Sequence, residues 1–442
     1  MTIEQLKKYE GIAIIEKDRH YTYGDLGKEI DRFARELEEK IFDGDVVCIY
    51  SDYSFKSIAL FLALSQNNSS IIVPIVPTTE VEFTSKIKAS SVNKILYFEG
   101  EMLCITHRQK GDSKAEYLKI IRKNQSGLVF FSSGTTGEPK VMVHNFSKLL
   151  KGFSIPKKTR NLRFLLFLLF DHIGGINTLL SCLNNGSAIV IPENRNPEYI
   201  LQLIEAKEIQ ILPTSPTFLN LMLMTEHFGK YDLSSLKMIT YGTERMPQAL
   251  LEKLRLKIPK VKFLQTFGTS ETGILKTESK SSTSLFFKIV DPHYEYRIEE
   301  GQLFLRSNNQ VSGYLNQESN QFTAEGWFAT GDLVETDDEG YLKIIGRINK
   351  VINVGGQKVL PKEIEDVINK IPGVIDTTVF SKVNAVTGQM VCAEVTVTGR
   401  TDKNEIKKEI WMACRKELDK YKVPSKIIIK NTISFSNRFK KR

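Results

Sequence analysis

The chain has 442 residues, of which 41% are hydrophobic and 26% are charged, and its formal net charge is +9. This composition is typical of a folded globular protein and excludes a disordered or fibrous chain, while the length predicts two or more domains. The densest apolar stretch, residues 164–170, is bounded by Arg163 and Asp171 and is far shorter than the roughly 20 residues of a membrane helix.

The termini and the charged residues narrow the class further. The opening MTIEQLKKYE has no apolar signal-peptide core, so we expect a cytoplasmic protein with no membrane span. The tail 426–442 carries Lys and Arg but no acidic residue, which is compatible with a solvated basic face or with attraction of ATP, CoA or an acidic carrier protein. We expect no nucleic-acid partner, because no nucleic-acid-binding motif is recognisable.

Cysteine and histidine spacing argues against a metal-binding or disulfide-stabilised fold. The five cysteines lie far apart without a CxxC pair, and the six histidines show no spacing such as HExxH. Cys48 and Cys392 fall inside apolar, strand-like runs, so we expect them in the core.

The first part of the chain alternates between helical and strand-like patterns. Apolar residues recur at helical spacing over 25–41, at Leu26, Ile30, Phe33, Ala34, Leu37 and Ile41. A buried strand at 46–50, a helix at 54–66 and strands at 71–76 and 95–98 follow. Alternation of this kind, continuing to about residue 275, predicts an α/β fold with parallel strand pairing and helices on both faces of the sheet.

A loop rich in glycine and hydroxyl residues, FSSGTTGEPK at 131–140, follows the strand-like run 128–131. Glycines let backbone N–H groups turn toward an anion, hydroxyls donate hydrogen bonds and lysine supplies charge, so the string predicts a phosphate-binding loop. An ordinary Ser/Gly turn is the alternative, and the spacing differs from a Walker A loop. The candidate residues are Ser132, Ser133, Gly134, Thr135, Thr136, Gly137 and Lys140.

The pattern changes after residue 275. The polar stretch 276–284 predicts a loop, and 285–345 is richer in short strands. The last ~95 residues predict a small α+β domain, with a helix over 361–370, strands near 374–380 and 390–397, a helix near 403–419 and a strand near 426–430. Pro361 stands at a first-turn position that suits proline.

Further motifs follow the loop along the chain. They are FDHIGG at 170–175, YGTE at 241–244, FGTSE at 267–271, GWFATGD at 326–332, GRINK at 346–350 with Gly356 and PKEIE beyond it, and SFSNRFK at 434–440. Together with TYGDL at 22–26 and GDVV at 44–47, these motifs resemble the adenylate-forming superfamily of acyl-CoA synthetases, peptide-synthetase adenylation domains and luciferases. The family's loop, roughly [YF]xSG[ST]TGxPKG, matches as far as Lys140 and departs at Val141.

The resemblance covers nearly the whole chain and implies a domain plan. A large N-terminal domain of several subdomains with helix-covered sheets, residues 1–348, would bind ATP and the acid. A small mobile α+β domain, residues 349–442, would rotate about a hinge at Asn349, where the family usually has Asp.

For the nucleotide, the resemblance implies a role for each matching residue. Gly242, Thr243, Glu244, Phe267, Gly268 and Thr269 would surround the adenine, Asp332 would accept hydrogen bonds from both ribose hydroxyls, and Arg347 would contact ribose and phosphate. Glu271 would bind Mg²⁺, because a hard cation prefers carboxylate and phosphate oxygens. Lys440 would be the catalytic lysine, acting with Thr135 and Glu271. Its motif departs at Phe439 and Ser434, so a plain basic tail is the alternative.

For the acid and the thiol, the resemblance leaves more choices. His172 would border the acid pocket, with a helix-capping or core histidine as the alternative. Asp171 is a rival, because in amino-acid-activating members an Asp near this position holds the substrate amine. Gly356 would line a tunnel for the thiol.

The implied function is ATP-dependent conversion of a carboxylic acid, medium-sized or fatty, to an acyl-adenylate, followed by transfer to a thiol. CoA is the expected acceptor, since NVGGQKVLPKEIE at 353–365 is similar to acyl-CoA ligases. The alternatives are an acyl carrier protein as acceptor, or an amino-acid-activating ligase. A non-catalytic nucleotide-binding homologue is the third possibility, kept open by Val141, Asn349 and Phe439.

Overall fold

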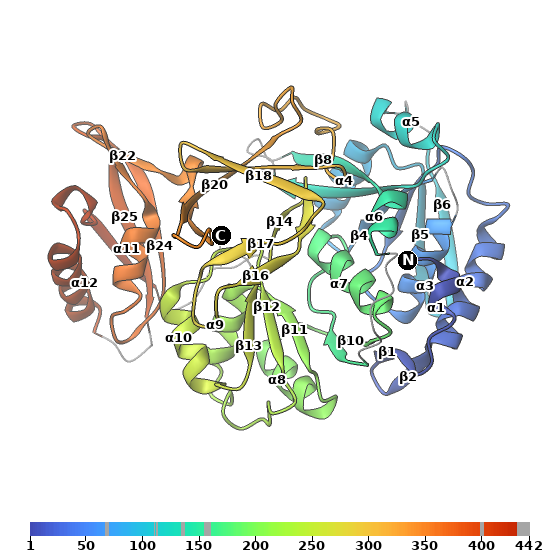
Figure 1. Ribbon diagram of the computed structural model, residues 1–442, viewed down its shortest axis with the longest axis horizontal. Helices are drawn as coiled ribbons and strands as arrows, with labels where there is room; N and C mark the ends of the chain where they lie inside the picture. The colour runs from blue at the N-terminus through green and yellow to red at the C-terminus, as the bar shows by residue number, and fades with distance from the viewer. Residues whose placement is uncertain are drawn as a thin grey trace.

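The computed structural model describes residues 1–66, 70–109, 111, 114–133, 138–153, 161–397 and 402–430. The N-terminal sheet, coloured blue to cyan, lies at one end of the molecule, and the C-terminal α+β unit, coloured orange to red, lies at the other (Figure 1). A second helix-covered sheet and an antiparallel sheet lie between them. This arrangement confirms the predicted α/β fold with a large N-terminal part and a small C-terminal domain.

The first sheet is mixed, and its central strands are parallel. In sheet order its strands are β6 (Met102–His107), β5 (Lys94–Glu99), β3 (Val46–Tyr50), β4 (Ile71–Ile75), β7 (Gly127–Ser133) and β8 (Pro139–Asn145). The helices of this region are α1 (Ile3–Leu6), α2 (Tyr23–Leu37), α3 (Phe55–Gln66), α4 (Glu80–Ser90), α5 (Ala115–Ile121) and α6 (Phe146–Gly152). Parallel pairing of β3 with β4 and β5, and of β4 with β7, confirms the prediction.

Local sequence explains the helices of this region. Thr22 caps α2 by accepting a hydrogen bond from the Asp25 N–H, and the Asp25 carboxylate accepts one from the Thr22 N–H. α2 ends at Leu37, before the predicted end at 41, although Ile41 is still buried. α3 is buried on nearly all sides, Lys56 and Gln66 excepted, because it lies inside the core cluster that joins the two helix-covered sheets.

The second sheet continues the βα alternation. In sheet order its strands are β13 (Lys262–Gln265), β12 (Met238–Tyr241), β11 (Ile211–Thr214), β9 (Arg163–Leu165), β10 (Ala188–Ile191), β1 (Ile12–Glu16) and β2 (Arg19–Thr22). Its helices are α7 (Ile173–Asn184), α8 (Pro197–Ala206), α9 (Pro216–Met224) and α10 (Gln248–Lys257). Because β11, β12 and β13 are parallel, their carboxyl ends meet at one edge, where Gly242 and Phe267 follow.

The middle segment is antiparallel. Its strands are the pair β14 (Phe267–Thr269) and β15 (Gly273–Leu275), and a sheet of β16 (Thr277–Ser279), β17 (Phe287–Ile289), β21 (Leu342–Arg347), β20 (Phe328–Thr336), β19 (Gln302–Ser307) and β18 (Tyr294–Glu299). The prediction of a continuous loop over 276–284 is wrong, because β16 lies within it. Its hydroxyl side chains bond the edge of β13: Thr277 donates to the Gln265 carbonyl, and Ser279 accepts from the Gln265 N–H.

The C-terminal domain has its own core. Its elements are η1 (Ile348–Lys350), β22 (Ile352–Val354), β23 (Gln357–Val359), α11 (Pro361–Ile368), β24 (Val374–Asn384), β25 (Gly388–Val397), α12 (Lys403–Glu417), η2 (Lys420–Lys422) and β26 (Lys426–Lys430). Ile364, Val395, Ile406 and Ile410 pack together between the helices and the sheet. The predicted helices and strands are confirmed, with α11 beginning at Pro361 and ending two residues early.

Cys48 in β3 and Cys392 in β25 are fully buried free thiols, which confirms their predicted place in the core. Across the described ranges, no helix is both long and apolar enough to cross a membrane.

Candidate active site

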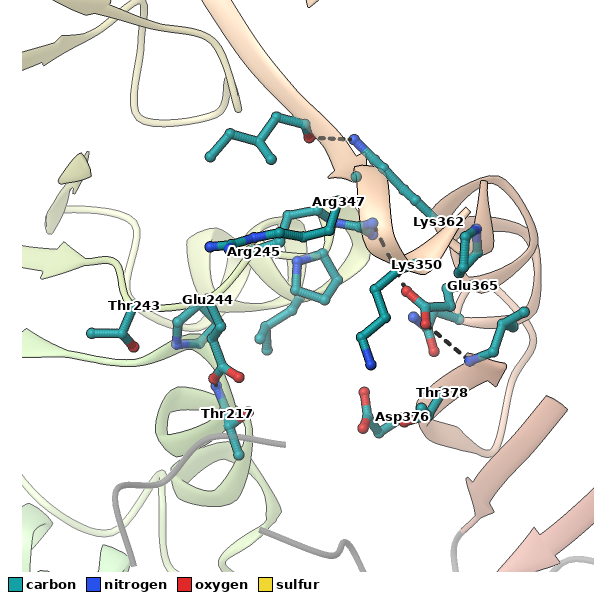
Figure 2. A pocket seen from close by; sticks show the side chains of 18 of the residues that line it. Thr217, Thr243, Glu244, Arg245, Arg347, Lys350, Lys362, Glu365, Asp376 and Thr378 are labelled. Carbon is teal, nitrogen blue, oxygen red and sulfur yellow. Dashed lines mark hydrogen bonds and ion pairs between the residues drawn. The ribbon is translucent and has the colours of Figure 1, made fainter. Parts of the chain in front are cut away.

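A cavity of about 900 Å³ lies between the large domain and the C-terminal domain. Thr217, Thr243 and Glu244 face it from the large domain, and Lys350, Asp376 and Thr378 face it from η1 and the C-terminal domain (Figure 2). Many of the predicted nucleotide residues line it together: Gly242, Thr243, Glu244, Phe267, Gly268, Asp332, Arg347 and the hinge residue Asn349. The structure therefore gathers motifs that lie more than one hundred residues apart in the sequence.

Asp332 and Arg347 form an ion pair on the wall of this cavity. Asp332 lies on β20 with 4% of its surface exposed, and Arg347 Nε donates to its Oδ1 at 2.6 Å. Burial raises the pKa of Asp332 from 3.8 to about 6, although the charge of Arg347 lowers it. The Arg347 side chain is 55% exposed, so it can leave the carboxylate for a ligand.

Close backbone approaches shape the part of the cavity that is predicted to hold the adenine. A Cβ on Gly242 would lie 2.5 Å from Thr266 Oγ1, and one on Gly268 would lie 2.3 Å from the Gly273 carbonyl oxygen, so both positions require glycine. Thr243 has a left-handed backbone, with φ at 68°. Glu244 accepts a hydrogen bond from the Thr217 N–H at 2.7 Å and so satisfies the first turn of α9.

Phe267 presents its ring to the same cavity while remaining largely buried. Its centroid lies 5.5 Å from that of Phe287 behind it, with the two rings inclined at 33°. A supported ring of this kind offers a fixed surface on which a planar base can stack.

Glu271 lies on the turn that joins β14 and β15, and a network of side chains holds it. The Thr269 hydroxyl accepts hydrogen bonds from the N–H groups of Glu271 and Thr272, at 3.2 and 3.1 Å. Tyr314 donates its hydroxyl proton to Glu271 Oε1 at 2.8 Å, and burial raises the pKa of that hydroxyl, which keeps it a donor. His144 on β8 donates from Nε2 to the Ser270 carbonyl at 2.6 Å.

Tyr314 and His144 were missed by the sequence analysis. They stand outside the recognised motifs, and the sequence shows no spacing that links them to the Glu271 turn. Lys140 joins the same network, since its Nζ lies 4.7 Å from the centroid of the Tyr314 ring.

The flanks of the phosphate loop form a hairpin in which Ser132 pairs with Lys140, and Ser133 with Pro139. Val141, which replaces the family's glycine, is fully buried beside Phe131 in the core of the sheet. The loop tip with Gly134, Thr135, Thr136 and Gly137, and also Lys440, lie outside the described residues.

The predicted acid-pocket residues have well-defined local partners. His172 is the N-cap of α7, and its Nδ1 accepts a hydrogen bond from the Gly174 N–H at 3.0 Å. Asp171 is 1% exposed and forms an ion pair with Lys86 Nζ at 3.2 Å, which itself is 4% exposed. Neither His172 nor Asp171 is among the described residues that line the large cavity.

Contacts between the domains fix their relative orientation. Arg245 makes ion pairs with Asp366 at 2.9 Å and Glu365 at 3.8 Å. Lys362 Nζ donates to the Ile344 carbonyl at 3.2 Å, and burial lowers the pKa of this lysine to about 8.

The turn that contains Gly356 does not line the large cavity. Gly356 is an exposed residue between β22 and β23 with a left-handed backbone, and its N–H donates to Asn353 Oδ1. It is not among the described residues that line the cavity, and an added Cβ would have no described atom within 4 Å.

Glu271 has the chemistry to bind a divalent cation together with a nucleotide. Its Oε1 accepts from Tyr314, and within the described ranges no side chain or N–H group bonds Oε2, so this second oxygen can face a metal. The part of the chain that the structure describes contains no group of three or more His, Cys, Asp or Glu able to hold a metal ion. A single carboxylate combined with phosphate oxygens and water is a usual set of ligands for Mg²⁺, so the residues present fit this ion.

Two models of known protein families match the chain. The model of the AMP-binding enzyme family matches residues 4–315, and that of the AMP-binding enzyme C-terminal domain matches residues 363–439. The chain belongs to the AMP-binding enzyme family. The match to both parts agrees with a large domain that carries most of the motifs and a small C-terminal domain.

Several curated proteins are similar to this family member. It is 30% identical to 4-coumarate-CoA ligase 1 of Narcissus pseudonarcissus over 63% of this chain and 57% of that protein. It is 28% identical to the long-chain-fatty-acid–CoA ligase FadD13 of Mycobacterium tuberculosis over 73% and 69%. It is 25% identical to the putative acyl–CoA ligase YdaB of Bacillus subtilis over 93% and 91%. The chain thus spans little more than half of the coumarate ligase.

Solved structures share the fold. The anthranilate CoA ligase AuaEII in complex with anthranoyl-AMP superposes with a TM-score of 0.80 at 18% identity, covering 99% of this chain and 95% of that one. ATP-bound MatB of Rhodopseudomonas palustris gives a TM-score of 0.80 at 19% identity, with coverage of 99% and 96%.

Proposed function

We propose that this AMP-binding family member activates a carboxylic acid with ATP, forming an acyl-adenylate and pyrophosphate, and then transfers the acyl group to the thiol of CoA. The observation that carries the proposal is the buried Asp332 carboxylate beside the exposed Arg347, in one cavity with Phe267, Gly242 and Gly268. Similarity to CoA ligases along 93% of the chain supports it.

Asp332 and Arg347 would bind the ribose and the phosphates. A carboxylate has about four acceptor sites, enough for two ribose hydroxyls, and Asp332 is held rigidly on β20. Arg347 would move from Asp332 toward the α-phosphate, where its charge offsets the charge that builds on phosphorus. Phe267 would stack on the adenine, while the backbone at Gly242, Thr243 and Glu244 would border its edge.

The acid brings its own nucleophile, so the chain only has to place it and neutralise charge. Glu271 would hold Mg²⁺ through Oε2, and Mg²⁺ when bound supplies positive charge to the phosphate oxygens. Ser132, Ser133, Thr135, Thr136 and Lys140, with the N–H groups of Gly134 and Gly137, would hold the pyrophosphate. Lys440 would bridge the attacking carboxylate and the α-phosphate.

On the acid side, His172, the N-cap residue of α7, would border the pocket. The ion pair of Asp171 with the buried Lys86 supports an acid without an amine, because the Asp171 carboxylate is already paired with a cation. The long-chain-fatty-acid ligase among the relatives supports a fatty or medium-sized acid. We keep the cytoplasm as the expected compartment, where both ATP and CoA are available.

The second half-reaction would need a change of domain orientation. We place the boundary at Asn349, within η1, so that residues 349–442 rotate as a unit. Rotation would bring the Gly356 turn toward the cavity to line the tunnel for the thiol, and would break the contacts of Arg245 and Lys362.

A panel of carboxylic acids tests this function. Pyrophosphate release is measured with ATP and each acid, with CoA or with an acyl carrier protein as acceptor. Release that requires an acid and yields a CoA thioester supports the proposal. Thioester formation only on the carrier protein would favour the alternative acceptor, and ATP binding without release for any acid would favour a non-catalytic homologue.

A further inference from the structure

Tyr314 lies on a segment that is bound tightly to the strand after the phosphate loop. Leu315 donates its N–H to the Val141 carbonyl at 2.7 Å. Asn316 accepts from the Val141 N–H at 3.0 Å and donates to the Pro139 carbonyl at 2.8 Å. Because β8 begins at Pro139, these bonds fix the position of Tyr314 relative to the loop that ends there.

The two chemical parts of the Tyr314 side chain contact two different charged groups. Its hydroxyl donates to Glu271 Oε1 at 2.8 Å, and its ring lies 4.7 Å from Lys140 Nζ. The same hydroxyl lies 3.0 Å from Gln321 Oε1, a second acceptor, and its single proton points to Glu271 Oε1, the nearer and charged acceptor. An ammonium over a tyrosine ring is attracted by the electron-rich face.

Glu271 and Lys140 carry opposite charges and contact the same tyrosine, so a direct ion pair is the alternative to the observed arrangement. A direct ion pair would use both charges on each other and leave neither for an incoming nucleotide. Tyr314 would prevent this in two ways, because its hydroxyl bonds one oxygen of Glu271 and its ring attracts the ammonium of Lys140. The second carboxylate oxygen stays available for a cation.

We propose that Tyr314 is a positioning residue that holds Glu271 and Lys140 at a fixed separation, so that both face the phosphates of ATP and its divalent cation. The inference rests on the proposed function, in which Glu271 binds the metal and Lys140 the phosphates. It assigns the hydroxyl to the metal side and the ring to the phosphate side.

Two substitutions separate these parts. Tyr314→Phe keeps the ring but removes the hydroxyl, and Tyr314→Leu removes both. Tyr294→Phe is the matched control, because the Tyr294 hydroxyl donates at 2.7 Å to the carbonyl of Thr272, on the same turn as Glu271. It removes a hydrogen bond from this turn without touching the Glu271 carboxylate.

The readouts are Mn²⁺ binding by electron paramagnetic resonance, in the presence of an ATP analogue with a methylene α–β bridge, and binding of that analogue by calorimetry in EDTA. Tyr314→Phe is expected to weaken Mn²⁺ binding about ten-fold, as for one hydrogen bond to a charged group, and to leave metal-free binding unchanged. Tyr314→Leu is expected to weaken both. Tyr294→Phe is expected to change neither.

Equal losses of Mn²⁺ affinity in Tyr314→Phe and Tyr294→Phe would overturn the proposal, because Tyr314 would then only stabilise the turn. Wild-type Mn²⁺ affinity in Tyr314→Phe would overturn it as well, even if Tyr314→Leu fails to fold. Failure of the proposed function has a different signature, since the wild-type protein would then release no pyrophosphate with any acid.

Discussion

Asp332 on the proposed nucleotide side and Asp171 on the proposed acid side are both buried aspartates, with 4% and 1% of their surface exposed. Each is paired with one cation, but the cations differ. The Arg347 side chain is 55% exposed, and this residue is the last one of strand β21. The Lys86 side chain, by contrast, is only 4% exposed and lies inside the large domain. A partner that is already in water can leave at little cost, and a buried partner cannot.

The comparison assigns different roles to the two carboxylates. Asp332 could exchange Arg347 for the hydroxyls of a ligand, which supports its place in the proposed binding site. Asp171 is held by Lys86, so it fixes the start of α7, and with it His172, relative to α4.

Breaking the buried pair should have the largest effect on stability. Lys86→Met leaves the Asp171 carboxylate buried without its cation, and loss of one partner of a buried ion pair costs about 3–5 kcal/mol. Lys86→Met combined with Asp171→Leu should recover most of this loss, which urea unfolding of the single and double variants measures. Equal stability of the two variants would contradict the account.

A matched control separates stability from substrate binding. Lys94 on β5 forms another buried pair in the large domain, with Asp45, which directly precedes β3, at 2.6 Å. Lys94→Met should also destabilise the protein, but only Lys86→Met should change the KM for the acid. An unchanged KM in both variants would remove Asp171 and Lys86 from the acid side.

Asp332→Ala should have the opposite effects, with a large loss of ATP affinity and a small loss of stability. Two hydrogen bonds from ribose to a charged acceptor are lost, at roughly 1.5–3 kcal/mol each, so ATP affinity should fall by about a hundred-fold or more. The folded state should lose little stability, because Asp332 is a buried carboxylate with a raised pKa. Calorimetry with ATP and thermal unfolding measure the two quantities, and unchanged ATP affinity would exclude Asp332 from the site.

The pKa of Asp332 predicts a smaller, pH-dependent effect. Because the folded-state pKa is raised from 3.8 to about 6, its stabilising contribution is present below pH 3.8 and is lost as the pH rises through about 6. The ionised carboxylate accepts more hydrogen bonds, so ATP affinity should rise over the same range. The ratio of wild-type to Asp332→Asn affinity, which cancels the titration of ATP itself, should increase from pH 5 to pH 7.

The arginine provides the check on this mechanism. Arg347→Ala removes the charge that lowers the pKa of Asp332, so the rise in affinity should move to higher pH. A ratio that does not vary with pH would show that Asp332 titrates far from this range.

His172 should give the smallest effect on stability. His172→Ala removes the N-cap of α7, which costs about 1 kcal/mol, and His172→Asn restores a capping side chain. If His172 also borders the acid, both variants should raise the KM for the acid while only His172→Ala lowers the melting temperature. Recovery of both quantities in His172→Asn would leave His172 with the capping role alone.

Sequence patterns predicted those parts of the molecule that are determined by neighbouring residues. The strand Val46–Tyr50 agrees residue for residue, because a short apolar run bounded by polar turns has few alternatives. The motif around Asp332 could also be recognised from the sequence, because its residues are contiguous in the chain. β16 was missed, because its polar side chains bond a strand edge that the sequence does not reveal.

The supporting contacts of the site could not be predicted, because each joins distant parts of the chain. Tyr314 is 43 residues from Glu271, Lys86 is 85 residues from Asp171, and Arg245 is 121 residues from Asp366. No local periodicity encodes such pairs. The sequence therefore located the groups expected to touch ligands, and the structure added those that hold them in place.

The most direct test of the account is isotope exchange between labelled pyrophosphate and ATP without any thiol. Exchange that depends on a carboxylic acid requires a bound acyl-adenylate, and we predict it for the wild-type protein. Lys440→Ala should reduce the exchange by about 10²–10³, as for loss of one charge-stabilising group, while Lys441→Ala should leave it nearly unchanged. Exchange that is absent with every acid, although ATP binds at Asp332, would contradict the account.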